Sequence, residues 1–142
     1  MGVYTDDNWT FSRGTVNGHP VIVRARAALP PKAEREVFSH LILISWAYDS
    51  EANDGFPSEP VRDEMETFET ALFDLFDENS PVACGVAVIT MNGKREWRFY
   101  ASDTELFMAG LNDALAGQIA YPIKLEAFLD PEWEGLREWI ET

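Results

Sequence analysis

The residues that most often carry chemistry are few in this chain and do not form a known catalytic pattern. The single cysteine, Cys84, lies in an apolar run that predicts a buried strand, where a thiol packs as a small apolar group. The two histidines, His19 and His40, have no His or Cys companions at the short spacing of a zinc site. Gly-rich phosphate loops, Gly-x-Ser-x-Gly and His-Glu-x-x-His are absent from the sequence. The sequence therefore predicts no catalytic residue, no metal site and no cofactor.

Carboxylates are the most abundant reactive groups. The chain has 25 Asp and Glu against 11 Lys and Arg, which gives a formal net charge of -14. Charge of this sign repels phosphate backbones and anionic lipid headgroups. We therefore expect no direct binding to nucleic acid and none to a membrane, and the partner that the charge favours is a basic protein. Solubility is the alternative explanation of the acidity.

One segment arranges these carboxylates at a helical spacing. Ser58 is a predicted N-cap, and the apolar residues that follow recur on one side of a helix while acidic residues recur on the other. This acidic stripe is either the solvated side of an amphipathic helix or a rim that steers a basic partner toward the domain. The acidic candidates for partner binding are Glu59, Asp63, Glu66, Asp74 and Asp77.

The remaining elements follow from turn and capping signals. Asn17-Gly18 and Asn92-Gly93 predict two tight hairpin turns, because both residues of these pairs tolerate positive φ angles. Ser102-Asp103-Thr104-Glu105 has the spacing of a capping box with Ser102 as N-cap, and Asp130-Pro131 predicts the start of a short terminal helix. The stretch 32–36 is predicted to be a loop or a short turn of helix. The predicted strands are 8–15, 20–28, 40–48, 82–91, 94–101 and 121–129, and the long helix ends at Asn79-Ser80-Pro81.

These elements predict an α+β fold. A chain of 142 residues that is 46% hydrophobic is long enough to bury one core, so we expect residues 1–142 to form a single domain. The predicted order is β-β-β-α-β-β-α-β-α. Without the first hairpin and the last helix, this is the ferredoxin-like split βαβ arrangement, an antiparallel sheet with both helices on one face. The N-terminal β-hairpin and the short C-terminal helix are additions to it.

The third strand predicts large side chains on both faces of this sheet. Ile42, Ile44, Trp46 and Tyr48 alternate with Leu41 and Leu43. If two helices cover one face, the other face either exposes aromatic residues to a partner or a second copy, or lies under the terminal helix with its Trp133 and Trp139. Both alternatives remain open at this point. The aromatic candidates for partner binding are Trp46 and Tyr48.

Several short motifs are spread along the chain: Asn8-Trp9-x-Phe11, Gly18-x-Pro20, His40-Leu41, Asn92-Gly93-x-Arg95-x-Trp97-x-Phe99-Tyr100 and Asp130-Pro131-Glu132-Trp133. Together they resemble the bacterial domain of unknown function family 695, over about residues 8–139. The resemblance implies no activity and defines no catalytic residue. Some relatives carry this domain beside one similar to the regulator of ribonuclease activity B, a small acidic ferredoxin-like protein that inhibits an RNA-degrading enzyme by binding it. We expect no such second domain here, because the chain ends at Thr142.

We therefore expect a non-catalytic binding or regulatory module that contacts another protein, for example an acidic inhibitor of a nuclease or a toxin. The alternative is a small hydrolase or other enzyme in which carboxylates and His40 meet in a pocket. A homodimer through the sheet is compatible with either. The single cysteine and the lack of a basic-then-apolar leader predict a cytoplasmic protein.

Overall fold

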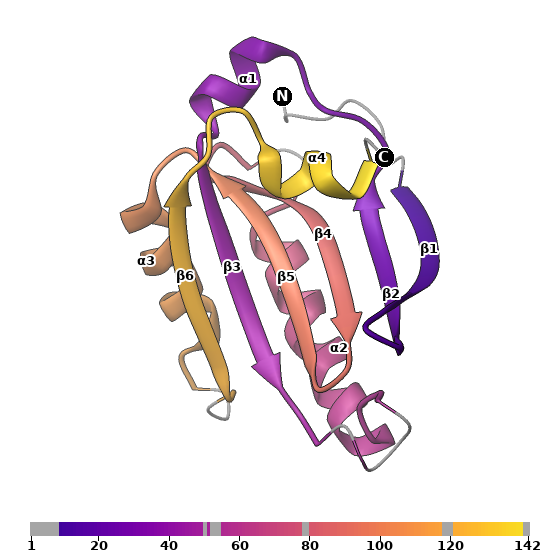
Figure 1. Cartoon of the computed structure of the whole chain (residues 1–142). Coiled ribbons are helices and arrows are strands. Elements are labelled where there is room, and N and C mark those ends of the chain that lie inside the picture. The colour runs from indigo at the N-terminus through magenta and orange to yellow at the C-terminus, as the bar shows by residue number, and fades with distance from the viewer. Residues whose placement is uncertain (1–8, 50, 52–54, 78–79, 118–120, 141–142) are drawn as a thin grey trace.

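The computed structural model describes residues 9–49, 51, 55–77, 80–117 and 121–140. Asn8 and Asn79, which the sequence places at the start of the first strand and the end of the long helix, lie outside the described residues. The stretch after the first hairpin, predicted as loop or helix, is helical. The elements in chain order are β1 (Trp9–Val16), β2 (His19–Arg26), α1 (Lys32–Val37), β3 (His40–Ala47), α2 (Glu59–Leu75), β4 (Ala83–Met91), β5 (Lys94–Ala101), α3 (Thr104–Leu115), β6 (Ile123–Leu129) and α4 (Glu134–Ile140) (Figure 1).

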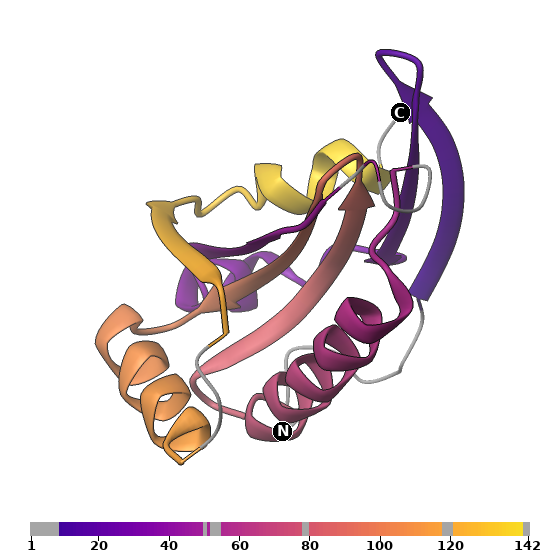
Figure 2. The ribbon, with the colours of Figure 1, turned by 90° about the horizontal axis from the view of Figure 1, so that it is seen from below.

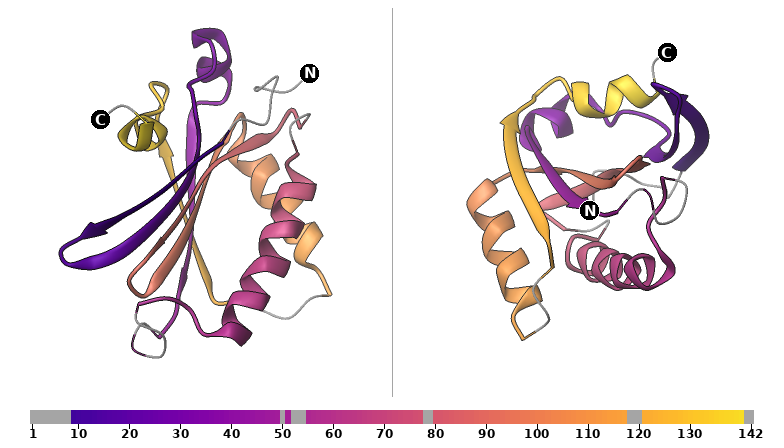
Figure 3. Two further views of the ribbon diagram at one scale, coloured as in Figure 1. Left: turned by 90° about the vertical axis from the view of Figure 1, so that its right-hand side faces the viewer. Right: turned by 60° about the horizontal axis from the view of Figure 1, so that its bottom comes forward.

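The strands form one six-stranded sheet in the order β1-β2-β4-β5-β3-β6. Every neighbouring pair is antiparallel, so the predicted α+β fold with an antiparallel sheet is confirmed. β5 lies between β3 and β4, the two strands that α2 connects, and β3 lies between β5 and β6, the two strands that α3 connects. The β1–β2 hairpin extends the sheet beyond β4 and curves away from it (Figure 3).

Both predicted hairpin turns are present, but in the second pair only Gly93, with a φ angle of 87°, adopts the left-handed conformation. Asn17 and Gly18 have φ angles of 54° and 81°, so both adopt the left-handed conformation that a two-residue type I′ turn requires. The register of the first hairpin runs without interruption from Val16 opposite His19 to Trp9 opposite Arg26. The local Asn-Gly signal therefore fixes which side chains of β1 and β2 share a face.

α2 and α3 cover one face of the sheet (Figure 3). Because apolar residues recur along α2 at helical spacing, Met65, Phe68 and Leu72 point at the sheet and are buried. Phe107 and Leu111 of α3 continue this core toward β6. Aromatic rings fill its centre, with Phe68 within 5.1–5.8 Å of three neighbouring ring centroids. Those three rings belong to Trp46, Trp97 and Tyr121.

The opposite face lies under α4 and the turn before it (Figure 2). Trp133 is fully buried there, and its ring stacks on Tyr100 with centroids 4.0 Å apart. Its indole nitrogen donates a hydrogen bond of 2.8 Å to the carbonyl oxygen of Phe38. The sequence left two alternatives open for this face, and in the structure the terminal helix covers it. Among the described residues, no aromatic cluster lies uncovered on this face.

The capping prediction for α3 is wrong by one residue. Asp103, not Ser102, is the N-cap, and its carboxylate accepts hydrogen bonds from the backbone nitrogens of Glu105 and Leu106. The Ser102 hydroxyl instead donates to the carbonyl oxygen of Pro81, which ties the end of β5 to the start of β4. Asp and Ser are equally good N-caps, so the choice depends on this tertiary contact.

Candidate functional site

All five acidic candidates are exposed. Four of them lie on α2, on the side opposite its buried apolar residues, and Asp77 follows the C-cap of this helix. We call this set the acidic face. It exists because α2 has a stripe of apolar residues that packs on the sheet, which leaves the acidic residues in solvent. Arg62 is the one basic residue of α2. The members of the acidic face are Glu59, Asp63, Glu66, Asp74 and Asp77.

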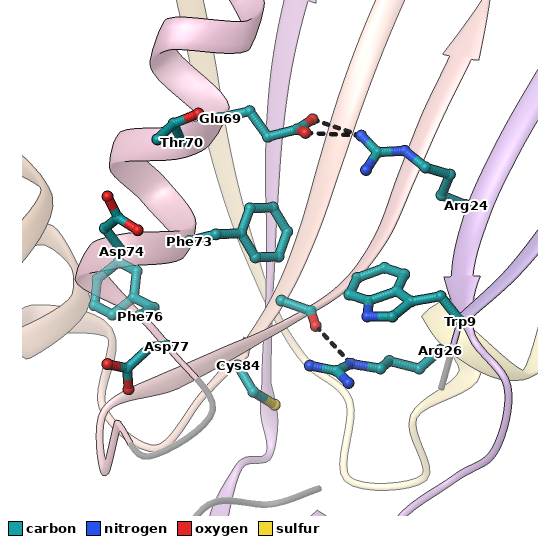
Figure 4. Close-up of a pocket in the computed structure, with 11 residues that line it drawn as sticks. Trp9, Arg24, Arg26, Glu69, Thr70, Phe73, Asp74, Phe76, Asp77 and Cys84 are labelled. Atoms are coloured by element: carbon teal, nitrogen blue, oxygen red, sulfur yellow. Dashed lines mark hydrogen bonds and ion pairs between the residues drawn. The ribbon is translucent and has the colours of Figure 1, made fainter. Parts of the chain in front are cut away.

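The acidic face adjoins a cleft of about 620 Å³ between α2 and the β1–β2 hairpin (Figure 4). Asp74 and Asp77 line both the cleft and the acidic face. The opposite wall comes from the hairpin and carries two arginines, Arg24 and Arg26, beside Trp9. One wall is therefore acidic and the other is basic and aromatic.

An ion pair joins the two walls. A terminal guanidinium nitrogen of Arg24 lies 2.8 Å from both carboxylate oxygens of Glu69 (Figure 4). Glu69 also accepts a hydrogen bond of 2.9 Å from the indole nitrogen of Trp97 in the core. Glu69 is thus the one acidic side chain of α2 that connects the helix to the sheet, whereas the acidic face points into solvent.

Arg26 forms the deeper part of the basic wall. It is only 6% exposed, and its guanidinium lies 4.6 Å from the centroid of the Trp9 ring. Its Nε donates to the carbonyl oxygen of Gly85 at 3.4 Å. Trp9 in turn meets Phe73 of α2 edge-on, with ring centroids 6.0 Å apart. Stacking and hydrogen bonding therefore hold this guanidinium in a fixed position.

Gly85 lies where β4 passes under the Phe73 ring of α2. A Cβ atom at this position would lie 2.4 Å from a ring carbon of Phe73. The ring of Phe73 would therefore have to move if any other residue stood at this position. The sequence contains no local signal for this contact, because Phe73 and Gly85 belong to different elements.

Cys84 is a buried residue of β4, as predicted. Burial raises the pKa of its thiol to about 12, and the positive charge of Arg26 opposes this shift only in part. The thiol is therefore protonated near neutral pH, which disfavours a role as nucleophile.

Of the two aromatic candidates for partner binding, Trp46 needs a correction. Trp46 is 3% exposed and packs against Phe68 under α2, so it belongs to the core and not to a partner surface. Tyr48 is half-buried, and its hydroxyl oxygen lies 2.7 Å from the carbonyl oxygens of both Gly55 and Met91, so two acceptors share its one proton. Burial raises the pKa of Tyr48. Even-numbered residues of β3 face α2, which already covers them.

The two histidines lie apart from the cleft. His40 begins β3 and His19 begins β2, and neither lines the cleft. The predicted alternative in which His40 and carboxylates share a pocket therefore has no counterpart in this cleft. Among the described residues, no group of three or more His, Cys, Asp or Glu side chains is placed to hold a metal ion.

The cleft residues Trp9, Arg24, Arg26 and Glu69 were not predicted as site residues. The register of the first hairpin could have predicted three of them, Trp9, Arg24 and Arg26. With Val16 opposite His19, Trp9 and Phe11 stand opposite Arg26 and Arg24, so an aromatic and basic strip is readable from the turn alone. Glu69 is separated from Arg24 by 45 residues, and no local pattern predicts their contact.

The fold and the site define an α+β domain with an acidic helix face and a mixed-charge cleft at one end of its sheet. The chain belongs to the family of unknown function DUF695, whose family model matches residues 7–140. A comparison with curated proteins finds no match. Among the described residues, no helix is both long enough and apolar enough to cross a membrane.

Proposed function

We propose that this chain is a non-catalytic protein-binding module and that its acidic face binds a basic protein. The observation that carries the proposal is the set of five exposed carboxylates, four along α2 and one just after it, beside a helix with a single basic residue. Carboxylates arranged in this way accelerate the approach of a positively charged surface and then form ion pairs at the rim of the interface.

The C-terminal end of α2 does not benefit from this arrangement. Asp74 lies in the last turn, where the negative end of the helix dipole disfavours an acid by about 0.3–1 kcal/mol. Glu59 and Asp63 are four residues apart, a spacing at which like charges repel by about 0.2–0.5 kcal/mol. A role in binding accounts for these unfavourable positions, whereas helix stability does not.

We further propose that the partner is a nuclease or a toxin with a basic site for phosphate groups. In this arrangement the carboxylates of the acidic face occupy the positions that substrate phosphates take. The formal net charge of -14 supports such a role, because it attracts a basic protein surface at long range. The same charge repels the nucleic acid that competes for that surface.

We also propose that the four-stranded part of the sheet is ferredoxin-like. Its support is the order of the strands. β3-α2-β4 and β5-α3-β6 are two strand-helix-strand units, and each is split by a strand of the other. Both helices lie on the same face, and β1, β2 and α4 are additions to this core (Figure 3).

The experiment compares capture by three forms of the tagged chain from the native lysate. The first is the wild type. The second neutralises the acidic face with Asp63→Asn, Glu66→Gln and Asp74→Asn. The third is a control that removes the same charge from exposed positions of α3 and β6, with Glu105→Gln, Asp113→Asn and Glu126→Gln. Retained proteins are identified by mass spectrometry at low and high salt.

We expect a basic protein to be retained by the wild type and the control, and to be lost from the α2 variant and at high salt. With the identified partner in hand, the α2 variant should lower its association rate by about tenfold or more at low salt, and the control should change it little. Equal retention by the α2 variant and the control would contradict the proposal.

A further inference from the structure

β1 is the outermost strand of the sheet (Figure 1). It pairs with β2 on one side, and no described strand pairs with its other side. From Thr10 to Val16 its side chains are exposed, including Phe11 at 61% and Val16 at 50%. Such an edge is a template for the addition of another strand.

The type I′ turn determines which backbone groups of β1 face outward. Val16 and His19 flank the two-residue turn and form a hydrogen-bonded pair, and such pairs alternate along an antiparallel ladder. Ser12 and Val16 therefore direct their backbone groups at β2. Phe11 and Arg13 direct theirs outward, at the open edge.

The two edges of the sheet differ in their protection. β6, at the other edge, carries Lys124 and Glu126 and directly follows Pro122. Charged side chains and proline are the usual devices that prevent strand addition at an edge. β1 is eight residues long, has no proline, lysine or acid, and has an uninterrupted register with β2. Its one charged residue is Arg13.

We propose that the chain forms a two-fold symmetric dimer in which β1 pairs antiparallel with β1 of a second copy. The two-fold axis passes at Ser12, so that Ser12 stands opposite the partner's Ser12 and Phe11 stands opposite the partner's Arg13. In this register the outward groups of Phe11 and Arg13 meet as hydrogen-bonded pairs. The two sheets become one continuous sheet.

The side chains of β1 suit this register. Arg13 already lies over the ring of Phe11 within its own strand, 6.0 Å from the centroid. In the dimer each Arg13 meets the ring of the partner's Phe11, so a cation–π contact joins the two copies and the two arginines do not face each other. On the opposite face of the strand, small and polar side chains meet, and these are Thr10, Ser12 and Gly14.

The charge distribution permits the contact in spite of the net charge of -14. Residues 9–28 contain three arginines and no Asp or Glu, so the acidic residues lie elsewhere in the chain. At about 4.8 Å per strand, five strand spacings separate β4 of one copy from β4 of the other, or about 24 Å. That separation is about three Debye lengths at physiological ionic strength, so repulsion between acidic residues near the two β4 strands is screened.

Disulfide trapping tests the register in the full chain. In the dimer, Ser12 and the partner's Ser12 form a non-hydrogen-bonded pair with Cα atoms about 4.5 Å apart, within the range of a disulfide. Ser12→Cys should therefore give a covalent dimer on mild oxidation. Thr10→Cys and Gly14→Cys are matched controls on the same exposed face, and each should cross-link at least about tenfold less, because residue 10 stands opposite the partner's residue 14. The native Cys84 is buried and does not contribute.

Sedimentation equilibrium tests the backbone pairing without a cross-link. Arg13→Pro removes an outward N–H and leaves the ladder to β2 intact, so it should weaken dimerisation by at least about 100-fold. Arg13→Thr removes the same charge but keeps the N–H, and it should weaken dimerisation by about tenfold or less. A wild type that stays monomeric up to its solubility limit, or equal cross-linking at positions 10, 12 and 14, would overturn the proposal.

Discussion

The two faces of the sheet are covered in different ways. Under α2 and α3, aromatic rings pack against one another, with Phe68 at the centre of Trp46, Trp97 and Tyr121. On the other face, α4 has only seven residues. Its attachment combines the stacked Trp133 ring with hydrogen bonds at defined positions. These bonds are made by Trp133 to Phe38, Tyr100 to Asp130, and Arg98 to Gly135 and Glu138.

This difference indicates two kinds of stabilisation. The area buried under two amphipathic helices is large, and the stabilisation from apolar burial does not depend on the direction of single contacts. A helix of seven residues buries less area, so its position depends on directional bonds and close contacts. On the face under α2 and α3, the loss of buried volume should therefore lower the free energy of unfolding most. On the face under α4, small changes of geometry or protonation should matter most.

The largest effect is expected from Phe68→Ala on the α2 face. Phe68 is fully buried and touches three aromatic rings, so its truncation should lower the free energy of unfolding by about 3–5 kcal/mol. Urea denaturation followed by tryptophan fluorescence measures this change. Leu106→Ala in α3 is the control, because that side chain is 54% exposed and its loss should cost less than about 0.5 kcal/mol. Similar losses in both variants would contradict the described core.

The next effect is expected from Gly135→Ala on the α4 face. A Cβ at Gly135 would lie 2.7 Å from a methyl carbon of Leu41 and 2.9 Å from the Tyr100 hydroxyl. Alanine normally favours a helix over glycine by about 1 kcal/mol, but we expect this overlap to outweigh that gain and to lower the free energy of unfolding by about 2 kcal/mol.

Gly14→Ala is the matched control for this change. No heavy atom lies within 4 Å of a Cβ built at Gly14, so the substitution should leave the stability almost unchanged. Urea denaturation of both variants provides the comparison. A Gly135→Ala variant as stable as the wild type would show that α4 is held loosely.

The third effect depends on pH and concerns Tyr100. Burial raises the pKa of Tyr100, and the hydrogen bond and negative charge of Asp130 raise it further. Because the pKa is higher in the folded chain, the unfolded chain loses this proton first as the pH rises. The contribution of Tyr100 to the free energy of unfolding is therefore fully present below about pH 10. Above that pH it falls by up to about 1.4 kcal/mol per pH unit.

Tyr100→Phe isolates this contribution. The variant should lose about 1–2 kcal/mol at neutral pH, because Asp130 then lacks the hydroxyl donor, but its stability should fall less steeply above about pH 10. Urea denaturation at several pH values measures both slopes. The raised pKa of Cys84 acts in both proteins and cancels in the difference. Parallel slopes would show that Tyr100 does not titrate as described.

The sequence predicts the elements better than their contacts. The hairpins follow from Asn17-Gly18 and Asn92-Gly93, and the exposed acidic face follows from the periodicity of α2, because these signals act within a few residues. Which helix covers which face is a long-range property, so the periodicity of β3 did not show that Trp46 lies in the core. The cleft depends on Arg24 and Glu69, which meet only after folding.

The smallest effect is expected from the ion pair between Arg24 and Glu69, which joins α2 to the β1–β2 hairpin. The Arg24 and Glu69 side chains are 43% and 20% exposed, so solvent screens their attraction. A double-mutant cycle with Arg24→Ala and Glu69→Gln, measured by urea denaturation, should give a coupling free energy of about 0.5–1 kcal/mol that decreases at high salt. Glutamine keeps an oxygen acceptor for Trp97, so the cycle separates the ion pair from the indole hydrogen bond. A coupling well above this range, unchanged by salt, would mean that directional polar bonds matter as much on the α2 face as they do under α4.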